Sequence, residues 1–222
     1  MSNNSSWDKL IPADEARVAI EFLDRTWKRL IELQPDKVRY SEHEPKLTER
    51  LCSYLSAFRA ESGLLGFWGN ENQSTFYDEN GELENRIKKD IIYQSNVAGN
   101  RIELVFEFKK LSRSSVSAYL GKDGMRRFVD GNYSIGQPLA LMVGITKDSS
   151  KQSVNAICKS LEKPSVRSEL EMVPNDVGNY IRRPSVAVEK VAVFDTEHRR
   201  SPDKAPYNGK IILAHMFLEC GK

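Results

Sequence analysis

Residues 87–110 contain several charged side chains, and polar and apolar residues alternate in the second half of this stretch. Asp90, Glu107 and Lys109 are the residues whose types suit chemistry. Neighbouring carboxylates repel each other and raise each other's pKa, which makes them poor structural material. Mg²⁺ takes one or two carboxylates and completes its shell with water and phosphate oxygens. The residue types therefore indicate a Mg²⁺ site with a lysine beside it.

A β-hairpin is the element expected to position these groups. Two apolar-rich segments, 91–95 and 101–108, are separated by residues 97–100, where Gly99 and Asn100 favour a tight turn. In the second segment apolar residues alternate with mostly charged ones, which is the period of a strand with one apolar face. The charged side chains are then expected on the other face.

Two hairpin registers remain open from the sequence. If Ala98 and Gly99 form the loop, Asp90 lies opposite Glu107; if Gly99 and Asn100 form it, Asp90 lies opposite Lys109. Either register places all three groups on one face, because opposed residues share a face. A three-residue loop would break this arrangement.

Asp90 followed by Glu107-Phe108-Lys109 resembles the PD-(D/E)xK superfamily of restriction-endonuclease-like nucleases. Lys89 stands where the proline of the motif would be, and that proline is often missing in the family. The resemblance covers residues 44–146 and implies a restriction-endonuclease-like core with Asp90 and Glu107 as metal ligands and Lys109 as a catalytic residue. The alternative is a surface hairpin that carries ordinary charges, since short motifs are weak signals.

Glu44 is a further candidate ligand. A helix expected over residues 44–61 has an apolar stripe, and Glu44 lies within roughly 40° of its centre, whereas Glu49 points almost the opposite way. The resemblance implies that an acidic residue on the helix before the sheet joins the metal, and Glu44 matches that position. The alternative is a charge favoured by the dipole at the start of a helix.

Basic residues outnumber acidic ones between residues 101 and 130, next to the proposed site. Phosphodiester substrates need such charges to position their backbone, although solvated helices also carry them. The predicted nucleic-acid contacts are Lys110, Arg113, Lys122, Arg126 and Arg127.

The composition is that of a globular protein. The chain has 222 residues, of which 40% are hydrophobic and 29% charged, and its net charge is +2, so a nucleic-acid surface must come from local clustering. We expect a single domain over residues 1–222. Within it, residues 1–11 form a flexible tail, 44–146 the nuclease-like core, and 147–222 a C-terminal elaboration that completes the sheet.

Several classes of protein do not fit this sequence. No apolar run approaches a membrane span and no signal peptide is evident, so we expect a cytoplasmic protein without membrane contacts. The three cysteines are far apart and the histidines lack zinc-ligand spacing, so a disulfide framework and a zinc site are not expected. A hydrolase with a serine or cysteine nucleophile lacks its motif.

The order of expected elements indicates an α/β fold, a mixed sheet flanked by helices. Further helices are expected over residues 12–33, 111–119, 122–129 and 149–161, a loop over 63–73, strands over 139–146, 186–194 and 211–219, and basic loops at 182–184 and 198–202. The segment 139–146 is almost uniformly apolar, as in a central strand covered on both faces. His215, within the last apolar strand, is expected to be a hydrogen-bonded core residue.

The resemblance implies a Mg²⁺-dependent nuclease, with Mn²⁺ as a substitute, that hydrolyses phosphodiester bonds of DNA rather than RNA in restriction, repair or antiviral defence. The competing interpretation is a non-catalytic nucleic-acid-binding or scaffold subunit that keeps the fold inside a larger complex. The sequence also leaves open whether the protein works with a second copy of itself or with a partner subunit.

Overall fold

The computed structural model describes residues 12–77, 83–97, 100–112, 115–147, 149–206 and 208–221. The predicted N-terminal tail, Arg113 and the hairpin residues Ala98 and Gly99 lie outside these ranges. The elements in chain order are α1 (Ala13–Leu33), η2 (Pro35–Lys37), α2 (Glu44–Ala57), α3 (Arg59–Ser62), β1 (Phe67–Tyr77), β2 (Leu83–Val97), β3 (Asn100–Lys110), α4 (Val116–Leu120), α5 (Met125–Val129), β4 (Leu139–Thr146), α6 (Lys151–Leu161), α7 (Pro164–Glu169), β5 (Ile181–Arg182), β6 (Phe194–Arg199) and β7 (Lys210–Glu219).

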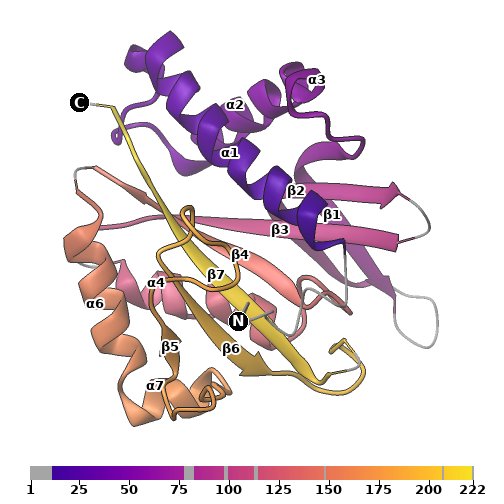
Figure 1. The fold of residues 1–222 in the computed structure, drawn as a ribbon, viewed down its shortest axis with the longest axis vertical. Coiled ribbons are helices and arrows are strands. Elements are labelled where there is room, and N and C mark those ends of the chain that lie inside the picture. Colours follow the sequence, from indigo (N-terminus) through magenta and orange to yellow (C-terminus); the bar gives the residue numbers. More distant parts are fainter. Residues whose placement is uncertain are drawn as a thin grey trace.

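The described strands form one mixed sheet in the order β1-β2-β3-β4-β7-β6-β5, so the expected mixed α/β fold is confirmed (Figure 1). β4 runs parallel to both β3 and β7, and the other neighbours are antiparallel. Every residue of β4 is buried, as its continuous apolar sequence predicts for a central strand.

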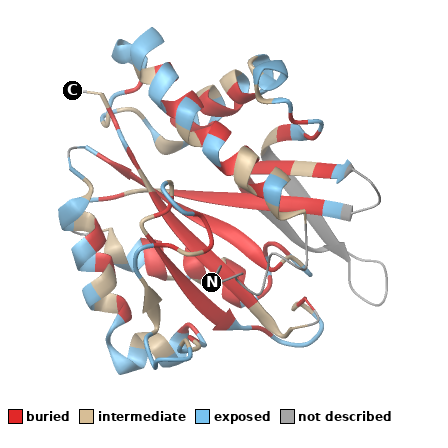
Figure 2. Cartoon of the chain, in the orientation of Figure 1, coloured by how far each residue is buried: buried red, intermediate tan, exposed pale blue. Residues whose placement is uncertain are grey.

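Helices cover both faces of this sheet, and the buried residues follow its central strands (Figure 2). One core cluster joins α1 and α2 to the sheet face that carries Phe106 and Phe108. The second joins α4, α5 and α6 to the face that carries Val105 and Met142. Because side chains alternate along β3, Glu107 and Lys109 belong to the second face, next to α5.

The β2–β3 pairing selects one of the two registers left open by the sequence. Val97 pairs with Asn100, and the ladder continues to Ile91 opposite Phe106. One step further along this register sets Asp90 opposite Glu107. The alternative in which Asp90 faces Lys109 is therefore wrong.

The predicted loop over residues 63–73 is wrong, because β1 begins at Phe67. Trp68 is buried, and its ring lies 5.0 Å from that of Tyr93 and 5.8 Å from that of Phe106. This aromatic packing across the sheet outweighs the turn tendency of the glycines. Gly66 is needed for close approach, since a Cβ there would lie 2.4 Å from the Tyr93 ring.

The predicted helix over 44–61 is divided into α2 and α3, which meet at Phe58. Leu47, Leu51 and Leu55 are buried along α2 as predicted, and Glu49 is exposed. Gly63, with φ +71°, follows α3 in the left-handed conformation that ends many helices. α1, α6 and β7 match their predicted spans to within two residues.

The predicted strand over 186–194 is also wrong, since β6 begins only at Phe194. The preceding apolar segment turns around the buried carboxylate of Asp195. Asp195 accepts hydrogen bonds from the Ser185 hydroxyl (2.6 Å), Val186 N (2.7 Å) and Ala187 N (2.9 Å). These bonds give the backbone partners outside the sheet, so β-propensity does not decide its conformation.

Among the described residues, no helix combines the length and the apolar character needed to cross a bilayer. The three cysteines are free thiols.

A buried chain of hydrogen bonds links β6 and β7 and fixes the tautomers of two histidines. His198 Nδ1 donates to the carbonyl of Leu170 (2.6 Å), so its Nε2 accepts from the Thr196 hydroxyl (2.7 Å). Thr196 Oγ1 in turn accepts from His215 Nε2 (2.9 Å), whose Nδ1 accepts from the Tyr119 hydroxyl (2.9 Å). His215 is thus a hydrogen-bonded core histidine, as predicted, whereas His198 is a buried strand residue and not part of a basic loop.

Acid should weaken this part of the core. Burial lowers the pKa of His198 to about 4, below its ordinary 6.5, so the unfolded chain takes up protons first and stability falls as pH drops from 7 towards 4. We expect the stability advantage of the wild type over His198→Gln to shrink by about 2 kcal/mol between pH 7 and pH 5. Urea unfolding of both proteins measures this, because the subtraction cancels titrating groups that they share. An advantage independent of pH would contradict a neutral His198.

Candidate functional site

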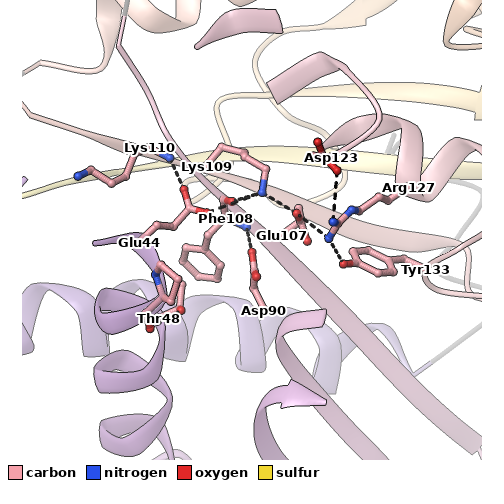
Figure 3. Close-up of polar contacts among 11 residues, drawn as sticks. Glu44, Thr48, Asp90, Glu107, Phe108, Lys109, Lys110, Asp123, Arg127 and Tyr133 are labelled. Atoms are coloured by element: carbon pink, nitrogen blue, oxygen red, sulfur yellow. Dashed lines mark hydrogen bonds and ion pairs between the residues drawn. The ribbon is translucent and has the colours of Figure 1, made fainter. Parts of the chain in front are cut away.

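The predicted catalytic residues come together where α2, the β2–β3 pair and α5 meet (Figure 3). Asp90 lies on β2, Glu107 and Lys109 lie on β3, and Glu44 is the first residue of α2. The strand pairing brings the first three together, and Lys109 links them to Glu44. Arg127, from α5, reaches the same cluster from the opposite side of Glu107.

Glu107 is the central and most deeply buried member, with a side chain that is 0% exposed. Its Oε1 accepts from Lys109 Nζ (2.7 Å) and lies 3.4 Å from Arg127 Nη1. Its Oε2 has no hydrogen-bond partner among the described residues. Burial, followed by the charge of Asp90, raises the pKa of Glu107 to about 7, and the two cations only partly offset this rise.

Asp90 is fixed to the neighbouring strand by its side chain. Its Oδ2 accepts from the backbone N–H of Phe108 (2.8 Å), which holds the carboxylate against β3 next to Glu107. The charge of Asp90 also contributes to the raised pKa of Tyr133, after burial and the charge of Glu107. Asp90 is therefore turned towards the cluster, as the hairpin pattern predicts.

Lys109 stands between the two flanking glutamates. Besides Glu107, its Nζ donates to the carbonyl of Phe108 (2.8 Å) and lies 3.7 Å from Glu44 Oε1. Burial works to lower its pKa, but the charges of Glu107 and Glu44 outweigh burial and the net shift is upward. Lys109 thus carries a positive charge at neutral pH.

Glu44 faces the cluster, on the inner side of its helix. Its Oε2 accepts from Lys110 N (2.6 Å), a direct link between α2 and the end of β3. Burial raises its pKa, and the charge of Lys109 opposes that rise. Lys110 turns away from the carboxylates, with Nζ donating to Glu42 O (2.7 Å) and lying 4.6 Å from the centre of the Tyr40 ring.

Comparison of the chain with protein-family models, with curated proteins and with solved structures gives no match. The PD-(D/E)xK assignment therefore rests on the residues and geometry described above, and it stays a prediction.

The carboxylates fit a divalent cation as a two-ligand site. The described residues contain no group of three or more His, Cys, Asp or Glu side chains arranged to hold a metal ion. Mg²⁺ does not require one, because it commonly binds one or two carboxylates and keeps several waters. Oε2 of Glu107, which no described residue contacts by a hydrogen bond, is an oxygen that such an ion can use. Glu44 has one oxygen occupied by Lys110 N, so its role as a ligand remains a prediction.

The predicted nucleic-acid contacts are distributed unevenly around this site. Arg127 touches it directly, and Lys110 adjoins it through its backbone. Arg126, on the same helix as Arg127, pairs instead with Asp130 (2.7 Å), and Lys122 is exposed on the loop before α5. The structure thus separates Arg127 from the other basic residues of this region.

Sequence reasoning missed Tyr133 as part of the site. Its hydroxyl accepts a hydrogen bond from Arg127, and its ring is buried against Phe128 with centroids 5.4 Å apart. Tyr133 lies in the loop after α5, so no helical or strand period connects it to Arg127. An aromatic residue near a basic helix was the available signal, and it is too common to single out.

Proposed function

We propose that the protein is a metal-dependent nuclease of the PD-(D/E)xK type that hydrolyses phosphodiester bonds. The observation that carries this proposal is the convergence of Asp90, Glu107 and Lys109 from two paired strands, with a buried carboxylate oxygen of Glu107 that has no partner among the described residues. Most buried polar atoms in proteins have a hydrogen-bond partner, and a carboxylate oxygen without one is available to a hard cation.

The topology supports the same proposal. An antiparallel β1-β2-β3 unit is followed by helices and by β4, which returns parallel to β3. This arrangement is compatible with a restriction-endonuclease-like core, and the two carboxylates lie on its neighbouring strands. Helix α2 packs beside this unit, and the contacts of Glu44 with Lys109 and Lys110 N support its proposed role as the additional acidic residue.

Each residue has a role that follows from its contacts. Asp90 and Glu107 would hold a hard divalent cation, which would polarise the scissile phosphate as a Lewis acid and lower the pKa of an attacking water. Lys109 orients that water and offsets the charge that develops on the phosphate, because its Nζ is charged and anchored to Phe108 O and Glu107. Its contact to Glu44, at 3.7 Å, is longer than a hydrogen bond, so a substrate oxygen can replace it.

The proposed substrate is DNA, which the family resemblance favours over RNA. The proposed biological setting is restriction, repair or antiviral defence. The deciding experiment is to incubate purified protein with linear DNA, circular DNA and RNA in Mg²⁺, Mn²⁺ or EDTA. Cleavage of circular DNA distinguishes an endonuclease from an exonuclease. Absence of cation-dependent cleavage of all substrates would remove the enzymatic proposal.

A second candidate function is a non-catalytic subunit that keeps the fold within a larger complex, alone or paired with a second copy. The observation that favours it is that Glu107 Oε1 already has two cationic neighbours, Lys109 and Arg127, which satisfy much of its charge without a metal ion. Such a subunit would bind nucleic acid with little dependence on divalent cations.

A Mg²⁺ titration distinguishes these candidates. We expect Mg²⁺ at ten times its dissociation constant to stabilise the wild type by about 1.4 kcal/mol, because the ion binds the folded state alone. Asp90→Ala should remove this gain, since it deletes one of the two carboxylates. Thermal unfolding of both proteins in Mg²⁺ and in EDTA measures the effect. An equal gain in both proteins would place the bound ion elsewhere.

A further inference from the structure

One oxygen of Glu107, Oε1, contacts two cations, and the two contacts differ in length and in exposure to solvent. Lys109 Nζ lies 2.7 Å from Oε1 with its side chain 16% exposed, whereas Arg127 Nη1 lies 3.4 Å from the same atom with its side chain 29% exposed. Lys109 has a second strong bond, to Phe108 O at 2.8 Å. Of the two cations, Arg127 therefore has the weaker contact with Glu107 and the better access to solvent.

The guanidinium of Arg127 that contacts Glu107 also contacts two residues outside the strand pair. Its guanidinium donates to the Tyr133 hydroxyl and lies 3.5 Å from Asp123, whose side chain is 63% exposed. The buried guanidinium of Arg200 donates to the carbonyl of Phe128 in α5 (2.8 Å) and to the carbonyls of Tyr133 and Ser134 (2.7 Å) in the loop that follows α5. The anchor of Arg127 is thus rigid, while its contacts with both carboxylates are long and replaceable.

A divalent cation at Glu107 would change which positive groups neutralise this carboxylate. Its positive charge would take over the neutralisation of Glu107 and repel the nearest guanidinium, which is a like charge. Lys109 would remain, because its hydrogen bond to the carbonyl of Phe108, at 2.8 Å, holds it in place. Arg127 is the group that would leave, and its planar fork of N–H donors matches phosphate oxygens.

We propose that Arg127 couples divalent-cation binding to nucleic-acid binding. In the cation-free protein it neutralises Glu107, and when a cation occupies the site its guanidinium turns to a phosphate oxygen of the nucleic acid. This inference rests on the proposed function and assigns Arg127 a positioning role that the other basic residues of the region do not share. By reciprocity, the nucleic acid tightens cation binding by the same factor.

The test measures affinity rather than cleavage. Fluorescence anisotropy gives the dissociation constant of a short labelled DNA duplex with Ca²⁺ and with EDTA, and the ratio of the two constants is the coupling. We expect a ratio of about tenfold or more in the wild type and below about threefold in Arg127→Ala. Arg126→Ala is the matched control, because it removes the same charge from the same helix without touching Glu107. Loss of this predicted nucleic-acid contact should weaken binding equally with Ca²⁺ and with EDTA, so the ratio of the two constants should stay that of the wild type.

Each outcome bears on a different claim. If Arg127→Ala keeps the wild-type ratio, or if Arg126→Ala lowers the ratio as much as Arg127→Ala does, the coupling role is overturned and the nuclease proposal stays intact. A wild type that neither binds the duplex nor gains stability from Ca²⁺ overturns both. If Arg127→Ala does not fold, Tyr133→Phe provides the same test, since it removes the hydroxyl that aims the guanidinium and should lower the ratio while the melting profile stays cooperative.

Discussion

Lys109→Ala is expected to lower the rate of Mg²⁺-dependent phosphodiester cleavage at least about 10³-fold, a loss of roughly 4 kcal/mol of transition-state stabilisation. The ammonium lies between Glu107 and Glu44, and no other described lysine has its Nζ against Glu107. Asp90→Ala should have an effect of the same size, because it removes half of the carboxylate pair. Initial rates on the substrate that is cut best measure both losses.

Folding should survive these substitutions. Asp90→Ala loses the hydrogen bond from Phe108 N but also relieves repulsion with Glu107, so the two terms oppose each other. A melting temperature close to or above that of the wild type is therefore expected for Asp90→Ala. Lys109→Ala should still unfold cooperatively, because Glu107, whose pKa is raised to about 7, can take up a proton when the ammonium is absent. Lys159→Ala, a charge change on the exposed side of α6, is the control and should cleave like the wild type. Cleavage that persists in both Lys109→Ala and Asp90→Ala preparations would exclude this cluster as the active site.

The central part of the site could be predicted because its signal is local. Alternation from Arg101 to Lys109 sets the face of β3, and the short break in the hairpin makes β2 its partner, so sequence spacing places Asp90, Glu107 and Lys109 on one face. The observed pairing then selects the register in which Asp90 lies opposite Glu107. Glu44 was also placed correctly on the inner side of its helix, because the apolar stripe of α2 has a clear period. These predictions need only helix and strand geometry.

The remaining features depend on contacts between residues far apart in the chain. β1 forms through Trp68, whose burial against Tyr93 no local pattern announces. The strand expected at 186–194 is replaced by a turn because Asp195 binds its backbone N–H groups. The Arg127–Tyr133 contact depends on Arg200, which lies more than sixty residues further along the chain and fixes the intervening loop. Propensity and periodicity carry no information about such pairings.

The raised pKa of Glu107 makes stability itself a readout of the site. For a carboxyl whose folded pKa is about 7 against an ordinary value of 4.5, the proton bound in the folded state stabilises below pH 4.5, and this gain is lost as pH rises through 7. At pH 8, where Glu107 is charged, the free energy of unfolding is therefore lower than it would be with Glu107 protonated. Glu107→Gln mimics the neutral form, keeps the size of the side chain and leaves Lys109 its contact with Glu44.

We therefore expect the stability of Glu107→Gln relative to the wild type to rise by about 2 to 3 kcal/mol between pH 5 and pH 8, measured by urea unfolding in EDTA. Glu103→Gln on the same strand is the control and should behave oppositely. Although burial alone would raise the pKa of Glu103, its hydrogen bond from Lys89 (2.7 Å) and the neighbouring charges lower it. Removing that carboxylate should cost most stability at high pH. Suppose that Glu107→Gln instead loses as much stability at pH 8 as Glu103→Gln does. The effect of the two cations on the pKa of Glu107 would then outweigh that of burial, and Glu107 would be a structural ion-pair partner rather than a metal ligand.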